Sequence, residues 1–365
     1  MTMYALPDAG VPGATDLTSA IGLDVSGVTP PAVRNLCSTV FARPFLRMPQ
    51  IETLRAYDLQ HASGYLATLR ACLDSLGNAA ASADLLGVHV NTFRYRLRRL
   101  VQVAGLDLDD ADTRLVCALE LATDARPVPY PSDTDVAAPQ WRGLAPSAPV
   151  AVVAFRVLSD DEDAPCRLAR MVALSWDAFR TSAWCDVTGH TVYSVVTLGS
   201  SSTYEVAATT VRRVVREAES ALGVTAVAGI GPVVDGVAQA DASRRVADEV
   251  LRAVVRRGGD HVATLDEVRT SVVLSAFAAA AAEWPDLDGG IVRRLAEHDA
   301  SRGTDYVESL RAYLDCFGDV TDAAARAYVH VRTFRYRLRR IAEIGGFRLD
   351  DPVARLSAHL ALRLR

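Results

Sequence analysis

Arginine, tyrosine and amide side chains gather in one short segment of the chain, and this segment occurs twice. The first copy, residues 89–99, reads HVNTFRYRLRR, and the second copy, residues 330–340, differs from it at one position. A guanidinium is planar and permanently charged, so it can bind a phosphate or the edge of a guanine with two hydrogen bonds. Asparagine and tyrosine add further donors and acceptors. These residue types predict a surface that binds DNA.

Helical geometry separates the inward and outward residues of the segment. With about 100° between successive residues, Phe93, Leu97 and Leu100 share one face, which must lie against a core. The polar residues point away from it or stand at the start of the helix. The candidate DNA-binding residues are His89, Asn91, Thr92, Arg94, Tyr95, Arg98 and Arg99 in the first copy, and His330, Arg332, Thr333, Arg335, Tyr336, Arg339 and Arg340 in the second.

Some residues of the segment favour a structural role. Arg96 and Arg337 fall beside the apolar stripe, which favours an ion pair, for example with the two aspartates that follow each copy. The two histidines favour a helix start or a backbone contact over a metal site, because no further ligands stand nearby. An arginine-rich helix that is merely solvated is the plain alternative. Two copies with the same outward face weaken it.

The repeat extends well beyond the arginine segment. Residues 65–121 align without gaps with residues 306–362, 241 positions later, and about half of the aligned residues are identical. Weaker matches reach back to the pair Asp58 and Asp299. In the first copy an Ala-rich helix over 79–86, a turn and a basic helix from about residue 90 to 103 predict a helix-turn-helix. Because another domain separates the copies, they cannot stack as a solenoid.

Composition and hydrophobic periodicity divide the chain into five segments. These are a loose N-terminal segment (1–30), a first helical module (31–124), a Pro-rich linker (125–149), a domain of alternating strands and helices (150–270) and a second helical module (271–365). The alternating domain has the order βαββαβαβ, with a hairpin over 183–197, a helix over 204–222 and a last strand over 261–265. The expected fold class is α+β multidomain, with two all-α helix-turn-helix modules flanking an α+β sandwich.

Bulk composition limits the class of protein. The 365 residues carry a formal net charge of −5, which argues against a histone-like protein that coats nucleic acid through bulk charge. There is no apolar run long enough to span a membrane and no basic signal-peptide start, so we expect a cytoplasmic protein with no membrane partner. The six cysteines are scattered, and we expect them to be small core residues that form neither a metal site nor a disulfide framework.

The segment from Gly87 to Arg99, followed by Gly105 and the pair Asp109-Asp110, resembles the C-terminal helix-turn-helix of the PucR/CdaR family of bacterial regulators. That helix-turn-helix is in turn similar to the one in the Fis nucleoid protein. Residues 226–231 and the helix that follows are similar to the degenerate GGDEF-like domain of those regulators, a ferredoxin-like sandwich. The resemblance, which covers residues 33 to 365, implies a transcriptional regulator that binds double-stranded DNA. The middle domain would then serve homodimer formation or the sensing of a small-molecule effector.

Three departures from the family pattern stand out, and the first two motivate an alternative. Val90 and Val331 replace the arginine that usually follows the histidine, and Tyr328 stands where the first copy has the turn residue Gly87. We therefore expect the second turn to be distorted or differently packed. A helical module also replaces the usual sensory domain. In the alternative, one or both modules have become protein-interaction or dimerisation units that no longer bind DNA.

Catalysis is not expected. A diguanylate cyclase needs paired acids at the hairpin tip, and the hairpin here reads DVTGHT over residues 186–191. Residues 160–163 are four consecutive acids, for which a solvated loop is favoured over a metal site. Residues 229–231 (GIG) lack the rest of a dinucleotide-binding pattern. We expect no enzyme activity, no catalytic residues, no metal and no cofactor.

Overall fold

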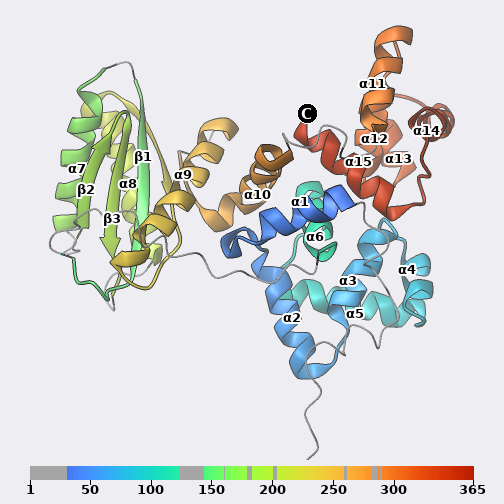
Figure 1. The fold of residues 1–365 in the computed structure, drawn as a ribbon, viewed down its shortest axis with the longest axis horizontal. Coiled ribbons are helices and arrows are strands. Elements are labelled where there is room, and N and C mark those ends of the chain that lie inside the picture. The colour runs from blue at the N-terminus through green and yellow to red at the C-terminus, as the bar shows by residue number, and fades with distance from the viewer. Residues whose placement is uncertain are drawn as a thin grey trace, which may run out of the picture.

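The computed structural model describes residues 31–123, 144–159, 161–178, 183–199, 204–258, 261–281, 287 and 290–365. The expected N-terminal segment and most of the Pro-rich linker lie outside the described residues. Figure 1 shows a sheet with its helices on one side of the molecule and the two helical modules on the other. The fold class is the predicted one, with helical modules before and after a mixed sheet.

The first module is entirely helical. Its helices are α1 (Pro31–Phe41), α2 (Pro49–His61), α3 (Tyr65–Asp74), α4 (Ala79–Leu85), α5 (Val90–Ala104) and α6 (Ala111–Leu121), with a 3-10 turn at Pro44–Leu46. From the sequence, Pro49 reads as an interruption of helical structure, but it is the first residue of α2, where its missing N–H costs no hydrogen bond.

The middle domain has the predicted βαββαβαβ order. Its elements are β1 (Val150–Leu158), α7 (Ala164–Ala178), β2 (Ala183–Thr188), β3 (Thr191–Thr197), α8 (Tyr204–Leu222), β4 (Thr225–Ile230), a 3-10 turn (Val237–Gln239), α9 (Ala240–Arg257) and β5 (Val262–Thr264). The strand order is β2-β3-β1-β4-β5, and among the described strands only β4 and β5 pair in parallel. Alternate residues of β1 face opposite sides, so that Val153 packs with α7 and α8 while Val152 packs with α9.

The second module repeats the first. It follows α10 (Leu265–Ala281) and contains α11 (Ile291–Arg302), α12 (Tyr306–Asp315), α13 (Val320–Arg326), α14 (Val331–Gly345) and α15 (Pro352–Leu364). Helix α10 begins earlier than the predicted residue 271. The Glu267 carboxylate accepts hydrogen bonds from the Thr264 backbone N–H (2.7 Å) and hydroxyl (3.0 Å), so a capping interaction starts the helix at the end of β5.

In each module an equivalent aspartate holds the turn between the first two helices of the repeat. Asp58 accepts hydrogen bonds from the backbone N–H groups of Tyr65 and Leu66, each at 2.8 Å. Its repeat equivalent Asp299 accepts from those of Tyr306 and Val307, each at 2.9 Å. Each carboxylate satisfies two of the backbone donors that the start of an α-helix leaves free. The distant sequence match between Asp58 and Asp299 therefore reflects a shared structural role.

Candidate nucleic-acid interface

Helices α5 and α14 each bury one face and expose the other. Phe93 and Leu100 on α5 are fully buried, as is Phe334 on α14. Every candidate DNA-binding side chain of the first copy is exposed or half-buried, from His89 to Arg99, and so is every candidate of the second copy. The predicted inward and outward faces are therefore the observed ones. The DNA contacts themselves stay a prediction.

Each helix begins at a histidine cap. The Nδ1 atom of His89 accepts a hydrogen bond from the Asn91 backbone N–H at 3.2 Å, and His330 does the same for Arg332 at 3.1 Å. This bond satisfies one of the free donors of the first turn. The predicted helix-start role of the two histidines is confirmed. Both rings are exposed, so they also lie where the first turn of the helix could meet DNA.

The outward arginines are largely free of acidic partners. Within the described residues, Arg94, Arg98 and Arg99 form no ion pair with a carboxylate; Arg99 donates to the amide oxygen of Gln102 at 3.2 Å. In the second copy Glu343 occupies the position of Gln102 and forms an ion pair with Arg340. The Glu343 carboxylate therefore offsets one positive charge on the outward face of α14, whereas the neutral Gln102 offsets none on α5. The two outward faces differ in charge for this reason.

Arg96 and Arg337 do not contact the aspartate pair that follows each copy. Arg337 donates to the Ser309 hydroxyl at 3.0 Å and lies 3.8 Å from the carboxylate of Asp305, just before α12. Its predicted ion pair exists, but with a different acid. Gly64 occupies the position of Asp305 in the first copy, where a side chain at Gly64 would lie 3.7 Å from the Arg96 guanidinium.

The turn between the two helices has the same backbone in both copies. Gly87 has a φ of 62° and Tyr328 a φ of 53°, both in the left-handed region. The next residue closes the turn in each case, since Val88 N–H donates to Ala83 O and Val329 N–H to Ala324 O, each at 3.0 Å. The expectation of a distorted second turn was wrong. Tyr328 accepts the conformation with its side chain 96% exposed.

The other sites considered from the sequence have structural explanations. The carboxylate of Asp161 forms an ion pair with Arg167 at 2.5 Å, and the two side chains are 42% and 41% exposed. This fits the predicted solvated acidic loop. A side chain at Gly231 would meet the Ser243 backbone oxygen of α9 at 2.2 Å, which leaves no room for a phosphate. Among the described residues there is no cluster of three metal-ligating side chains, and no helix is suited to crossing a membrane.

The cysteines only partly fit the expectation of core residues. Cys37, Cys72 and Cys117 are buried, and burial raises the pKa of each thiol, to about 12 for Cys37 and Cys117 and about 11 for Cys72. Cys166 is exposed on α7, where the prediction was wrong.

Comparisons with known proteins match the two modules separately. Residues 65–123 and 306–364 each match the PucR C-terminal helix-turn-helix domain. The DNA-binding transcriptional activator AdeR of Bacillus subtilis is 32% identical over 71 residues, 20% of this chain and 17% of AdeR. An uncharacterised protein of Mycobacterium tuberculosis is 39% identical over 61 residues, 17% of this chain and 14% of that protein. The chain therefore matches less than a fifth of the length of these relatives.

Among solved structures, the chain is similar to a regulator of polyketide synthase expression from Bifidobacterium adolescentis. The match has a TM-score of 0.31 and 18% identity, and it covers 60% of this chain and 82% of the other.

Proposed function

From the two PucR C-terminal helix-turn-helix domains that this chain carries, we propose that it is a sequence-specific DNA-binding transcriptional regulator. Helices α5 and α14 act as recognition helices, each lying in a major groove, which is wide enough for one helix. The observation that supports this most is the matched outward face, on which Arg94, Arg98 and their equivalents Arg335 and Arg339 are exposed without acidic partners among the described residues.

The negative net charge of the chain is compatible with this role. Charges act on DNA mainly within a Debye length, about 8 Å at physiological ionic strength, so the local arginines decide the interaction. Guanidiniums near a phosphate release counterions from the DNA, and those in the groove can bind guanine edges. The name of the matched activator AdeR agrees with such a function.

The middle domain, in this proposal, mediates homodimer formation or senses an effector. Its helix α9 packs against α10, and α10 packs against α1 and α6 of the first module. A groove of about 480 Å³ lies between α1, α9 and α10, and Arg43, Arg252 and Arg256 line it. This volume is within the range of small-molecule sites. The Glu249 carboxylate also lines the groove and pairs with Arg252 at 2.7 Å, so Arg43 and Arg256 supply its net positive charge, which suits an anionic compound. Sedimentation of the full chain over a range of concentrations tests the homodimer.

A gel-shift series across salt concentration tests DNA binding. The wild-type chain is expected to bind about 10³-fold or more weakly at 200 mM than at 50 mM salt if it contacts six or more phosphates. Replacing Arg94, Arg98 and Arg99 with alanine should weaken binding. It should also reduce the slope of log affinity against log salt by about one for each phosphate that the variant no longer neutralises.

The matched control removes three exposed arginines elsewhere, with Arg170, Arg216 and Arg257 of the middle domain each replaced by alanine. It changes the net charge equally and should leave DNA binding intact. If the recognition-helix variant binds like the wild type, α5 is not the DNA-binding element. If the wild-type chain binds no DNA at any salt, the DNA-binding proposal fails and the alternative of protein-interaction units is favoured.

A further inference from the structure

The two helix-turn-helix modules contact each other through equivalent residues. The Arg114 guanidinium of α6 donates to the backbone oxygen of Asp315, at the end of α12, at 2.5 Å. The Arg355 guanidinium of α15 donates to the backbone oxygen of Asp74, at the end of α3. Arg355 is the repeat equivalent of Arg114, and Asp315 that of Asp74, so each contact is the image of the other.

The same two arginines fix their own modules. Arg114 also donates to the backbone oxygens of Leu108 and Asp109, at 2.7 and 2.8 Å, and Arg355 donates to that of Leu349 at 2.6 Å. Both arginines are only 6% exposed. A buried guanidinium is costly unless its donors are satisfied, and here the partner module supplies one of the acceptors. The contact is therefore built into the packing of both modules.

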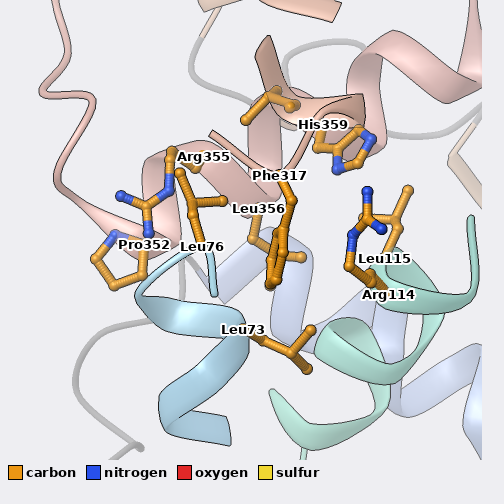
Figure 2. Close-up of a pocket in the computed structure, with 10 residues that line it drawn as sticks. Leu73, Leu76, Arg114, Leu115, Phe317, Pro352, Arg355, Leu356 and His359 are labelled. Carbon is orange, nitrogen blue, oxygen red and sulfur yellow. The ribbon is translucent and has the colours of Figure 1, made fainter. Parts of the chain in front are cut away.

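An apolar pair lies between the arginines. Leu76 and its equivalent Phe317 have left-handed φ values of 50° and 51°, so the two turns share one backbone conformation at this position. Figure 2 shows Leu76 and Phe317 next to each other, with Arg355 on one side and Arg114 on the other. A side chain at Gly77 would lie 2.8 Å from the Phe317 ring, and one at Gly318 would lie 2.8 Å from Leu76. Each glycine admits the side chain of the opposite module.

A cavity of about 50 Å³ in this contact is lined by four repeat-related pairs, together with Pro352 and His359 of α15, whose equivalents in the first module do not line it. The four pairs are Leu73 with Leu314, Leu76 with Phe317, Arg114 with Arg355, and Leu115 with Leu356. Ligand sites usually exceed about 300 Å³, so this space is a packing gap between the modules. The pairing of its lining shows that the same patch is used on both sides. Such an interface is isologous and implies a twofold axis.

We infer that a single chain holds its two helix-turn-helix modules as an internal pseudo-twofold dimer and binds an inverted repeat in DNA with one copy of itself. The inference rests on the proposed function. An axis that relates the modules also relates α5 to α14, so the two half-sites must run in opposite directions at a fixed spacing. The patch that would join two separate chains is already occupied within one.

The pseudo-symmetry also predicts that the two half-sites are not identical. Asn91 on α5 corresponds to Arg332 on α14, near the start of each helix. Asparagine pairs best with adenine and arginine with guanine. The bound sequence is therefore expected to be an imperfect palindrome, with the half-sites differing at the base that this position contacts.

Complementation in trans tests the inference. A DNA duplex is first selected from random sequence with the full-length wild-type chain. Two variants are then compared with it, one with Arg94, Arg98 and Arg99 changed to alanine and one with the equivalent Arg335, Arg339 and Arg340 changed. Each should bind the selected duplex about 10²–10⁴-fold more weakly, because a chain that binds only one half-site no longer gains from linked binding.

An equimolar mixture of the two variants separates the possible arrangements. If both half-sites are bound within one chain, the mixture stays as weak as either variant. Sedimentation of the wild-type complex then gives one chain for each duplex, and a homodimer joined through the middle domain would hold two duplexes. If the mixture regains wild-type affinity, the half-sites are bound by different chains and the inference is overturned, while the proposed function stands. If the wild-type chain selects no DNA, the proposed function fails and the inference with it.

Disruption of the interface gives an independent result. The double variant Leu76→Asp with Phe317→Asp should select half-sites at variable spacing, because the modules no longer hold one orientation. The control pair Leu158→Asp with Leu174→Asp changes exposed residues of the middle domain and should keep the fixed spacing. If the aspartate variant fails to fold, Leu76→Ala with Phe317→Ala replaces it. A fixed spacing in a folded interface variant would overturn the inference.

Discussion

Tyr328 adopts a strained backbone conformation, and its turn has the same backbone geometry as the turn at Gly87. Its φ of 53° is in the left-handed region, where a side chain costs about 1 kcal/mol relative to glycine. The side chain is 96% exposed, so little packing offsets this cost. We predict that Tyr328→Gly raises the free energy of unfolding by about 1 kcal/mol, measured by urea denaturation.

The first module supplies the reverse experiment for this turn. Gly87→Tyr should lower the free energy of unfolding by a similar amount, because it introduces the same strain into the same backbone. If Tyr328→Gly destabilises the protein instead, the tyrosine makes a stabilising contact that offsets its backbone cost.

At the scale of the element, helix α6 contains a buried acid. Glu120 is 3% exposed, and one carboxylate oxygen accepts a hydrogen bond from the Met48 backbone N–H at 2.8 Å. Burial raises the pKa of Glu120 to about 7, although the Met48 hydrogen bond and the charge of Arg47 act in the opposite direction. The folded state therefore favours the protonated acid.

The raised pKa predicts that stability depends on pH. A group whose pKa is higher in the folded state stabilises it fully below its unfolded pKa, about 4.5, and that contribution disappears as pH rises through about 7. At 1.36 kcal/mol per pKa unit the decrease is about 3 kcal/mol. Denaturation curves of the wild type and Glu120→Gln between pH 4.5 and 8 isolate this effect, because the buried His359, whose pKa burial lowers, acts equally in both proteins. The stability of the wild type relative to Glu120→Gln should fall by this amount across the range. The exposed Glu219→Gln should decline like the wild type.

Most elements could be predicted because their signals are local. The outward face of α5 follows from helical phase, the start of α15 from the Asp351-Pro352 cap, and the order of the middle domain from alternating patterns. Helix α2 has no such signal, because only Ile51 and Leu54 of it are buried, which gives a weak periodicity. The start of α10 has a local signal that could have located it, because Thr264 and Glu267 have the Thr-x-x-Glu spacing of a capping box.

At the scale of the whole molecule, the repeat predicted that the modules are equivalent but not that they face each other. In the sequence, Leu76 continues the apolar pattern of the helix that ends before Gly77, and no local pattern marks Arg114 or Arg355 as buried residues. Their burial depends on contacts across more than 200 residues of chain, such as that between Arg114 and Asp315. No local pattern encodes such a contact.

Because of this interface, a destabilising substitution in one module is expected to destabilise the other module as well. The Phe317 ring lies 4.6 Å from the Arg114 guanidinium and contacts the first module beside Gly77. Phe317→Ala removes a large apolar side chain and the cation–π contact, at a cost of about 3 kcal/mol. Hydrogen exchange should therefore become faster in residues 74–77 and 108–114 of the first module, although the substitution is in the second.

Phe347→Ala offers the matched control for this experiment, because Phe347 packs within the second module and against Gly345. It should speed exchange in the second module alone. Equal exchange in the first module for Phe317→Ala and the wild type would mean that the two modules open independently and that their contact contributes little to stability.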